Sequence, residues 1–502
     1  MMELSPEKKR VVGLPVGQTG RVLAGPGTGK TRVLVARYLK FVLEDRIAPD
    51  RLLALTFTKK AAGEMQKRIF EGILECKDDE LLRQLYGAWI MNFHQFAFRV
   101  IKENAPSFEI DPDIGIATEV ERLRICRVVG EAFEGGRVAG MPEAFESDMP
   151  SPKKLGPLFD KAMKIILKAR DMLWTTDTLL KNIHSDDTPE YRRFVETVIA
   201  VWNAYESELR RRSLIDFGDM IRIVVDKLQG NEQLRNHYGG RFEHILVDEF
   251  QDTSIVQNEM LRLLSGGDFS RVTVVGDDKQ SIYRWRDACV DNLRNFEGET
   301  YHLKTNYRST QDILDLAHRF IIEDTYFKPL ATEIELGADR GASKAPICVF
   351  HPPDGAEDSV AAEAKALGAW VASLTGLLPK KDVPFAHYRN APDRVDFGDI
   401  AILMRTLKAS SGLPLYEAEL HRLRIPFAIV GGVSALEDRV LELFKNILRL
   451  LIYPDDIASF LSIVEAKPYS LPDGALRELF TAAGKNASVV ELLNEKTLSQ
   501  VG

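Results

Sequence analysis

A short segment near the amino terminus carries the residue types of a phosphate-binding loop. The loop Ala24-Gly25-Pro26-Gly27-Thr28-Gly29-Lys30-Thr31 has a small residue, four variable positions and then Gly-Lys-Thr, and Arg32 follows it. Glycines let backbone N–H groups converge on phosphate oxygens, because no Cβ stands in the way. Lys30 would place a charge on the β and γ phosphates, and the Thr31 hydroxyl would ligate Mg²⁺. The predicted ligand is a nucleoside triphosphate with Mg²⁺.

A second segment, "ILVDEFQD" at 245–252, supplies the carboxylates that such a loop needs. Asp248 follows residues that suit a buried strand, so its carboxylate is expected at the strand tip near the metal. Glu249 is placed to orient or deprotonate an attacking water. An isolated Asp-Glu pair is usually a solvated loop. Together with the phosphate loop, the pair instead predicts hydrolysis of the nucleotide.

Elements of an α/β protein with a parallel sheet must position these residues. Short apolar runs alternate with helical patterns, which is typical of that class. Ligands of such sheets lie at the carboxyl ends of the strands. The helix expected after Thr31 would also direct the positive end of its dipole at the phosphates. Buried strands are expected at 21–25, 52–57, 244–250 and 271–277.

The periodicity changes along the chain and predicts several domains. Strand-like runs are scarce between 106 and 208, which indicates a helical insertion, and a second α/β pattern begins near 301 with strands expected at 345–351 and 397–406. Helices dominate again from 436. The expected division is 1–105 and 209–300 as two parts of a first core domain, 106–208 as a helical accessory insertion, 301–435 as a second core domain that is incomplete, and 436–502 as the start of a second helical accessory domain.

Composition excludes several other classes. The chain has 502 residues and a net charge of −8, which argues against indiscriminate coating of nucleic acid but allows a local basic groove. The four cysteines show no metal-binding or redox spacing. No run is apolar and long enough to span a membrane, and the first residues lack a signal-peptide pattern. We therefore expect a cytoplasmic protein without a membrane partner.

Further segments extend the pattern over nearly the whole chain. Their order is "AGPGTGKTR" (24–32), "LTFTKKAAGEM" (55–65), "NFHQFAF" (92–98), "LIDFGDMI" (214–221), "VDEFQDTS" (247–254), "VVGDDKQSIYRWRDA" (274–288) and "LKTNYRST" (303–310). With these segments the chain resembles the UvrD/Rep-like branch of superfamily 1 DNA helicases. The resemblance implies two RecA-like P-loop domains with parallel sheets and helical insertions.

The resemblance also implies roles for residues outside the loop. Gln280 carries an amide that could read the γ-phosphate and link it to DNA. Arg308 resembles the family's γ-phosphate arginine, which reaches across from the second core domain. Tyr307 would stack on adenine. With Glu249 and Lys30, Gln280 and Arg308 complete the expected catalytic set, and ATP with Mg²⁺ is the expected cofactor.

Aromatic and basic residues predict a contact with single-stranded DNA. Core packing is the usual role of a lone aromatic, and a structural histidine is as common as one that binds DNA. Together, however, these side chains suit a track on which bases stack, a contact worth about 1–3 kcal/mol per base. The expected DNA-binding residues are Phe57, Lys59, His94, Tyr283, Trp285 and Arg286.

Some positions depart from the family pattern. Lys8 stands where the family has its adenine-reading Gln, which leaves adenine specificity open. Asn92 and Gln95 replace the usual Thr and Ser, and Asp287 replaces Gly. No segment after about 436 matches the family's later blocks. The chain is therefore expected to be truncated before the C-terminal helicase motifs, and a protein partner could supply that half.

The leading hypothesis is an ATP-dependent helicase or translocase motor acting on single-stranded DNA or on junctions of single and double strands. The resemblance implies 3′ to 5′ movement and a role in DNA repair, replication or recombination. One alternative is an ATP-gated module that binds single-stranded DNA without unwinding. Another is the motor part of a helicase–nuclease complex. A P-loop kinase fits worst, because "GDDKQSIYRWR" would have no role in it.

Overall fold

A computed structural model describes residues 4–140, 152–184, 187–283, 288–325, 335–342, 359–378, 395–407 and 412–430, with a few isolated positions elsewhere. The chain divides into two compact units, residues 1–343 and 344–502, and each is considered by itself. The first unit holds the phosphate loop and almost all of the predicted site residues.

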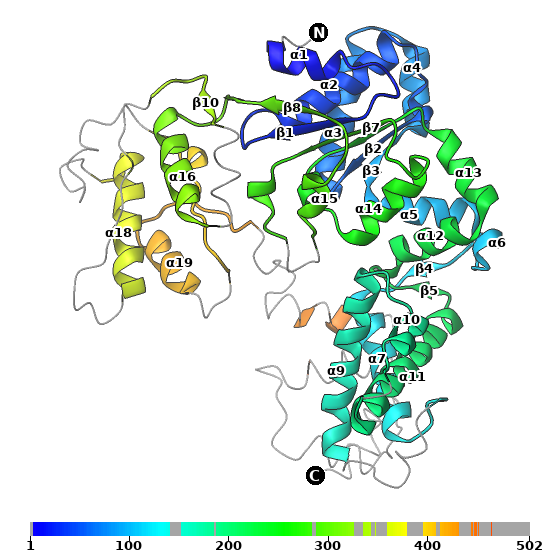
Figure 1. Cartoon of the computed structure of the whole chain (residues 1–502). Coiled ribbons are helices and arrows are strands. Elements are labelled where there is room, and N and C mark those ends of the chain that lie inside the picture. Colours follow the sequence, from blue (N-terminus) through cyan, green and yellow to red (C-terminus); the bar gives the residue numbers. More distant parts are fainter. Residues whose placement is uncertain are drawn as a thin grey trace. The chain divides into compact units, whose positions relative to one another are not determined.

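The centre of the first unit is a six-stranded parallel sheet (Figure 1). Every pair of neighbouring strands in it runs parallel, which confirms the predicted α/β class with a parallel sheet. Each of the four predicted strands is present, although β6 ends at Val247, earlier than expected, because a tight turn follows it. In spatial order the strands are β3 Trp89–Asn92, β2 Leu52–Thr56, β6 His244–Val247, β7 Val272–Gly276, β1 Gly20–Ala24 and β8 Glu299–Leu303.

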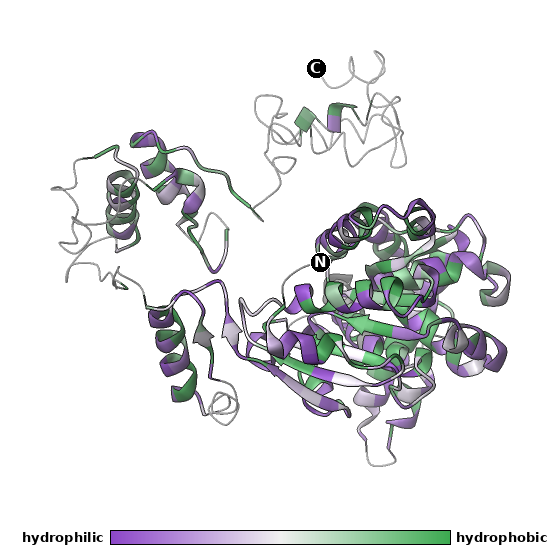
Figure 2. Ribbon diagram, turned by 90° about the horizontal axis from the view of Figure 1, so that it is seen from above, coloured by the Kyte–Doolittle hydropathy of each residue, from purple (hydrophilic) through white to green (hydrophobic). Residues whose placement is uncertain are grey.

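Helices cover both faces of this sheet, as parallel sheets require. Figure 2 shows apolar residues along the strands and on many of the covering helices. One face packs on α1 Pro6–Val12, α2 Lys30–Leu43, α3 Lys59–Leu74 and α4 Asp79–Gln84. The other packs on α5 Phe93–Glu103, α6 Ala105–Phe108, α12 Asp219–Gly230, α13 Glu232–Arg241, α14 Ile255–Leu264 and α15 Asp291–Arg294.

Short 3₁₀ turns join several of these elements. They are η1 Pro49–Arg51, η2 Leu85–Gly87, η3 Phe250–Asp252 and η4 Asp278–Gln280. Two of them, η3 and η4, directly follow the ends of β6 and β7, so they hold the residues that come after the strand tips at the edge where ligands of parallel sheets bind.

A helical lobe is inserted between β3 and β6. It consists of α7 Glu119–Glu134, α9 Pro152–Asp171, α10 Thr176–Lys181 and α11 Pro189–Arg211, which share a hydrophobic core of their own. The chain leaves and returns through a short parallel pair, β4 Gly115–Ile116 with β5 Leu214–Ile215. The lobe is therefore joined to the rest of the first unit at a narrow neck.

After β8 the chain continues through β9 Thr305–Asn306, α16 Gln311–Glu323 and β10 Gly337–Ala338, still within the first unit. In the second unit the structure describes α18 Ser359–Leu374, η8 Phe397–Asp399 and α19 Leu413–Arg422. Val371, Ala372, Leu420 and Ile425 form a small apolar cluster there.

The second unit differs from one sequence-based expectation. Residues 400–406 form no strand, and Leu403 is 93% exposed. An extended segment becomes a strand only with a hydrogen-bonded neighbour, and none lies beside it among the described residues. The other expected strand, 345–351, and the helices expected after 436 lie almost entirely outside the described residues. The predicted domain boundaries remain predictions. Among the described helices, none is long and apolar enough to cross a membrane.

Candidate nucleotide and DNA site

The phosphate loop connects the end of β1 to the start of α2. Gly27 and Gly29 adopt the left-handed backbone, with φ of 71° and 89°, which a side chain would disfavour. The Thr28 hydroxyl donates to the carbonyl of Gly25 over 2.8 Å and closes the turn. Ala24 ends the strand and Lys30 begins the helix, so the predicted loop residues lie together as a cradle in front of a helix amino terminus.

Two glycines of the loop have no room for a side chain, because neighbouring segments pack closely on them. A Cβ on Gly27 would lie 2.6 Å from Cβ of Arg308 and 2.7 Å from Nδ2 of Asn306. A Cβ on Gly25 would lie 2.6 Å from a methyl group of Leu336. Real Cβ atoms do not approach neighbours so closely. The segments around Arg308 and Leu336 therefore pack directly against the phosphate loop.

Two pairs of predicted residues meet at this loop. Nζ of Lys30 lies 2.7 Å from Oε2 of Glu249. The Thr31 hydroxyl donates to Oδ2 of Asp248 over 2.7 Å. These residues are far apart in sequence and meet because parallel strands end at the same edge of the sheet. The cation, hydroxyl and two carboxylates predicted from sequence therefore form one cluster.

Negative charge exceeds positive charge in this cluster. Burial, followed by the charge of Glu249, raises the pKa of Asp248 to about 6. The same two causes raise the pKa of Asp252 to about 7, and its buried Oδ1 has no hydrogen-bond partner. Lys30 alone does not offset three neighbouring carboxyl groups. A divalent cation would supply the missing charge.

Magnesium fits the donor set found here. Within the described residues, no group of three or more His, Cys, Asp or Glu side chains could hold a metal by itself. Mg²⁺ is usually bound by one or two protein oxygens together with substrate phosphates and water. The Thr31 hydroxyl and the Asp248 carboxylate are oxygens of that kind.

Glu249 has an unusual backbone. Its φ of 49° is left-handed, a conformation that a residue with a side chain adopts only when the surroundings hold it. The turn directs the carboxylate towards Lys30, while the amide of Glu249 donates to Oδ1 of Asp248 over 3.1 Å. The two adjacent carboxylates therefore have separate positions in the cluster.

A chain of hydrogen bonds runs from Glu249 to the loop after β7. The Gln251 amide donates to Oε2 of Glu249 over 2.8 Å, and its carbonyl oxygen accepts from the backbone of Asp277 over 3.0 Å. Oδ2 of Asp277 then accepts from Nε2 of Gln280 over 2.7 Å. Gln280 is thus linked to Glu249 through two intermediate residues, Gln251 by its side chain and Asp277 by its backbone amide and its carboxylate.

Tyr307 and Arg308 lie beside the phosphate loop, within the same compact unit. The amide of Tyr307 donates to the carbonyl of Gly27 over 2.9 Å. Nδ2 of Asn306 donates to the carbonyl of Pro26, and its Oδ1 accepts from the amide of Arg308 over 2.8 Å. Arg308 is exposed, and none of the ion pairs among the described residues includes it. Its backbone is therefore fixed while its guanidinium faces solvent.

Two of the predicted DNA-contacting aromatics lie together. The rings of Phe57 and Tyr283 are 5.1 Å apart, and both are partly exposed. Phe57 follows the end of β2, and Tyr283 follows η4, three residues after Gln280. The hydrogen-bond chain from Glu249 therefore leads to the segment that carries one of these rings.

His94 lies in the first turn of α5, two residues after the end of the neighbouring strand β3. Asn92 and Gln95, which depart from the family pattern, form a reciprocal capping box at the start of α5. His94 stacks on Phe217 with ring centroids 4.1 Å apart. Burial lowers the pKa of His94 to about 4, so the ring is neutral at pH 7 and cannot give a phosphate a positive charge. Its contact with DNA remains a prediction.

The remaining predicted residues are less informative. Lys59 is exposed at the first position of α3, next to Phe57. Arg32 lies on α2 and is partly buried. Trp285 and Arg286 lie outside the described residues, as does Asp287.

Sequence reasoning missed three residues of the site. Asn306 fastens the Arg308 segment to the phosphate loop, Gln251 links Glu249 to Asp277, and Phe217 stacks on His94. All three stand inside quoted motifs. Their type gave no signal, because an amide or a ring acquires such a role only through a partner that is distant in the sequence.

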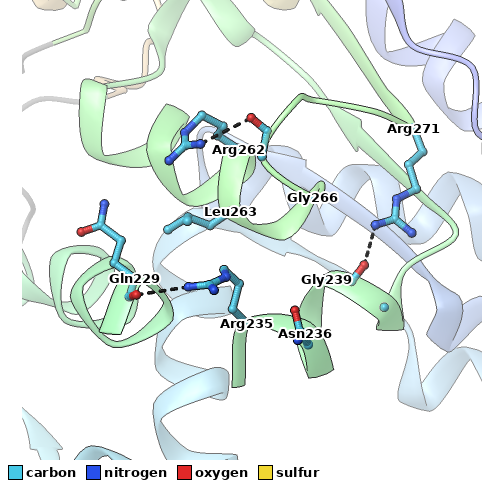
Figure 3. A pocket seen from close by; sticks show the side chains of 10 residues that line it. Gln229, Arg235, Asn236, Gly239, Arg262, Leu263, Gly266 and Arg271 are labelled. Carbon is cyan, nitrogen blue, oxygen red and sulfur yellow. Dashed lines mark hydrogen bonds between the residues drawn. The ribbon is translucent and has the colours of Figure 1, made fainter. Parts of the chain in front are cut away.

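One cavity of the first unit lies at the opposite edge of the sheet (Figure 3). It has a volume of about 530 Å³, and its lining includes Arg235, Arg262 and Arg271. The three guanidinium groups donate to carbonyls of Gln229, Gly267 and Gly239, respectively. These arginines therefore hold the last turns of α12 and α13 and the loop that precedes β7, and the cavity is separate from the nucleotide site.

Two sequence models of one helicase family match successive parts of the chain. The sequence model of the UvrD/REP helicase N-terminal domain matches residues 4–301. That of the UvrD-like helicase C-terminal domain matches residues 301–501. The expectation that the chain stops before the C-terminal helicase motifs is therefore wrong, because the second match extends to residue 501.

Individual relatives agree with these matches. The ATP-dependent DNA helicase PcrA of Leuconostoc citreum is 28% identical over 485 residues, which are 95% of this chain and 57% of the relative. DNA helicase II of Haemophilus influenzae is 29% identical, with 94% of this chain and 57% of the relative covered. DNA helicase II of Escherichia coli is 29% identical, with 95% and 59% covered. The chain thus spans a little over half the length of these relatives.

Proposed function

Because the chain belongs to the UvrD/REP helicase family, we propose that it is the motor of an ATP-dependent DNA helicase. Hydrolysis of ATP would drive movement along single-stranded DNA, in the 3′ to 5′ direction that the resemblance implies. Repair, replication or recombination of DNA is the setting that such a motor would serve. The relatives' names, which describe ATP-dependent DNA helicases, support this assignment.

One observation carries the proposal. The cluster of Lys30 and Glu249 is connected through Gln251, Asp277 and Gln280 to the segment that bears a partly exposed aromatic ring, Tyr283. A hydrolase without a polymer substrate has no need of such a connection. A motor needs such a connection, because its affinity for DNA must change when the bound nucleotide is hydrolysed.

The proposed roles of Lys30, Thr31, Asp248 and Glu249 rest on their chemistry, and those of Gln280 and Arg308 on the family resemblance. Lys30 and the loop amides would hold the β and γ phosphates, and Mg²⁺ would be held through Thr31 and Asp248. Glu249 would orient or deprotonate the attacking water. Gln280 would respond to the γ-phosphate, and Arg308 would stabilise the charge that develops on it.

Single-stranded DNA is the substrate that the exposed rings favour. Phe57 and Tyr283 would stack on bases without sequence preference, with Lys59 near the backbone. Trp285 and Arg286 remain predicted members of this track, and a preference for junctions and a cytoplasmic location remain predictions. We do not propose a protein partner that supplies C-terminal motifs, because the model of the C-terminal domain matches this chain itself.

The test is ATP hydrolysis with and without single-stranded DNA. A motor is expected to hydrolyse ATP much faster with oligo(dT), and Lys30→Ala is expected to abolish hydrolysis in both conditions. Tight binding of ATP and DNA without turnover would favour the ATP-gated binding module instead. A rate of ATP hydrolysis that is the same with and without DNA, at every DNA concentration, would contradict the proposal.

A further inference from the structure

A buried lysine beside the phosphate loop has no part in the roles assigned above. Lys8 lies on α1 and is 3% exposed. Its Nζ lies 4.1 Å from the centroid of the Tyr307 ring and 3.1 Å from where a Cβ on Gly29 would stand. Burial and then the charge of Arg32 lower the pKa of Lys8, and the carboxylates of Glu7 and Asp339, which attract it through space, only partly offset this. A buried ammonium without a carboxylate partner is costly, so its position calls for a ligand.

The helix that carries Lys8 is held rigidly against the sheet. The fully buried Arg37 donates to the carbonyls of Val11 and Leu14 over 2.9 and 2.8 Å, just after Lys8. It also donates to the Thr273 hydroxyl on β7 over 3.1 Å. At the other end, the amide of Lys304 donates to the carboxylate of Glu7 over 3.0 Å. The position of Lys8 is therefore fixed by contacts of the residues that precede it and of those that follow it.

Lys8 lies against the ring on which the base of a bound nucleotide is expected to stack. Tyr307 is 36% exposed and is tied to Gly27 through its amide, so its ring stands beside the loop that would hold the phosphates. A base stacked on Tyr307 would then have the Lys8 ammonium at its edge. In the protein alone, that ammonium covers the ring by a cation–π contact, which the base would replace.

The chemistry of an ammonium limits which base it can recognise. A lysine offers three donors and no acceptor. The edge of guanine or hypoxanthine presents two acceptors, O6 and N7, whereas adenine presents N7 beside a donating amino group. We propose that Lys8 selects 6-oxopurine bases, so that GTP and ITP are hydrolysed at least as efficiently as ATP. The proposal rests on the proposed function, since it assumes a nucleoside triphosphate at the loop.

The test measures kcat/KM for ATP, GTP and ITP with saturating oligo(dT). In the wild-type chain, GTP and ITP are expected to equal or exceed ATP. Gln can donate to N7 and accept from the amino group of adenine, so Lys8→Gln is expected to shift the GTP to ATP ratio towards ATP. The expected shift is about 5- to 150-fold, the range found for one base read through two hydrogen bonds.

Two further variants keep the result interpretable. Lys9→Gln, at the exposed neighbouring position on α1, is expected to leave every ratio unchanged. Lys8→Met has a side chain of similar length without hydrogen-bond donors. It is expected to bring the ratio of kcat/KM for GTP to kcat/KM for ATP close to one. Melting temperatures of the three variants show whether α1 has remained in place.

Each outcome separates this inference from the function on which it rests. If Lys8→Gln lowers kcat/KM for all three nucleotides equally, the ammonium contacts phosphate or ribose, and the inference is wrong. A wild-type preference for ATP over both GTP and ITP would also overturn it. In both cases hydrolysis stimulated by DNA would leave the motor assignment standing. If no nucleotide is hydrolysed faster with DNA, the motor assignment itself fails.

Discussion

At the scale of single residues, the arrangement explains how a nucleotide would change the site. Lys30 and Glu249 neutralise each other across 2.7 Å when no phosphate is present. A triphosphate brings more negative charge than Glu249 and would draw Lys30 towards it. The carboxylate of Glu249 would then be released to act on water, while Gln251 still donates to Oε2, the same oxygen that Lys30 had contacted. Binding of the nucleotide and activation of the water are thereby the same event.

Glu249→Gln tests this division of labour. The amide keeps the size of the side chain but cannot accept a proton from water, so kcat is expected to fall by about 10² to 10⁴. The dissociation constant of ATP is expected to change little, because Lys30 and the loop amides remain. Steady-state kinetics and calorimetric titration measure the two quantities separately. Turnover close to that of the wild type would assign water activation to another group.

Phe57→Ala tests the aromatic contact. Removal of a ring on which a base stacks is expected to weaken binding of oligo(dT) by about 1–3 kcal/mol. Fluorescence anisotropy with a labelled oligonucleotide measures this, and Phe70→Ala, which removes a half-exposed ring from α3, is the matched control. Equal affinities of the wild type and Phe57→Ala would assign Phe57 to packing against Tyr283.

The reactive residues could be predicted from sequence because each sits in a short motif with fixed chemistry. Lys30, Thr31, Asp248 and Glu249 meet where a strand–loop–helix pattern places them. Asn306 could not be predicted in the same way, since its role depends on a backbone carbonyl in a distant loop. Motifs thus reveal reacting groups more readily than the groups that position them.

At the scale of elements, the neck, which joins the helical lobe to the rest of the first unit, contains a buried network of charged side chains. Arg170 on α9 is 3% exposed and lies 2.7 Å from the Asp219 carboxylate on α12. It also lies 3.4 Å from Glu206 on α11. Asp216, just after β5, accepts a hydrogen bond from Tyr205 over 2.7 Å. The motif "LIDFGDMI" therefore joins the lobe to the sheet as well as providing Phe217.

Arg170→Met is expected to destabilise this neck strongly. It would take one of the two guanidinium partners from the buried Asp219 carboxylate and leave Arg222 as the other, and loss of one member of a buried pair typically costs about 3–5 kcal/mol. Denaturant unfolding measures the change. Arg127→Met on α7, whose ion pair with Glu131 is exposed, is the matched control, with an expected cost below about 1 kcal/mol. Similar losses in the two variants would show that the network contributes no more than a surface pair.

Elements could be predicted where the sequence itself carries the pattern. Apolar runs ending in charged or glycine-rich loops located β1, β2, β6 and β7, because a strand covered on both faces must be apolar throughout. The segment 400–406 has the same composition but no described neighbour with which to pair. Composition predicts a tendency to extend, whereas a strand also requires a partner.

At the scale of the whole molecule, one buried histidine couples folding to pH. Burial first, and then the charges of Arg37 and Arg271, hold the pKa of His244 well below 6.5. The folded chain therefore keeps this ring neutral, whereas the unfolded chain protonates it below pH 6.5. Its stabilising contribution is complete above pH 6.5 and is lost as the pH falls towards the folded-state pKa.

The free energy of unfolding is expected to decrease by up to about 1.4 kcal/mol per pH unit through this group below pH 6.5. Urea unfolding between pH 7 and 5 measures the slope. His244→Asn is expected to lower the slope of unfolding free energy against pH by the amount that one proton contributes. His237→Asn, at an exposed position, is expected to leave this slope unchanged. An unchanged slope in His244→Asn would mean that other groups govern the acid sensitivity.

Movement along DNA is the central claim, and it can be measured directly. Stopped-flow fluorescence would follow ATP-driven arrival of the wild-type chain at a fluorophore on the 5′ end of oligo(dT) of increasing length. The account predicts a delay that grows in proportion to length, and no such delay when the fluorophore is on the 3′ end. Arrival times independent of length at both ends, although DNA still stimulates ATP hydrolysis, would contradict it.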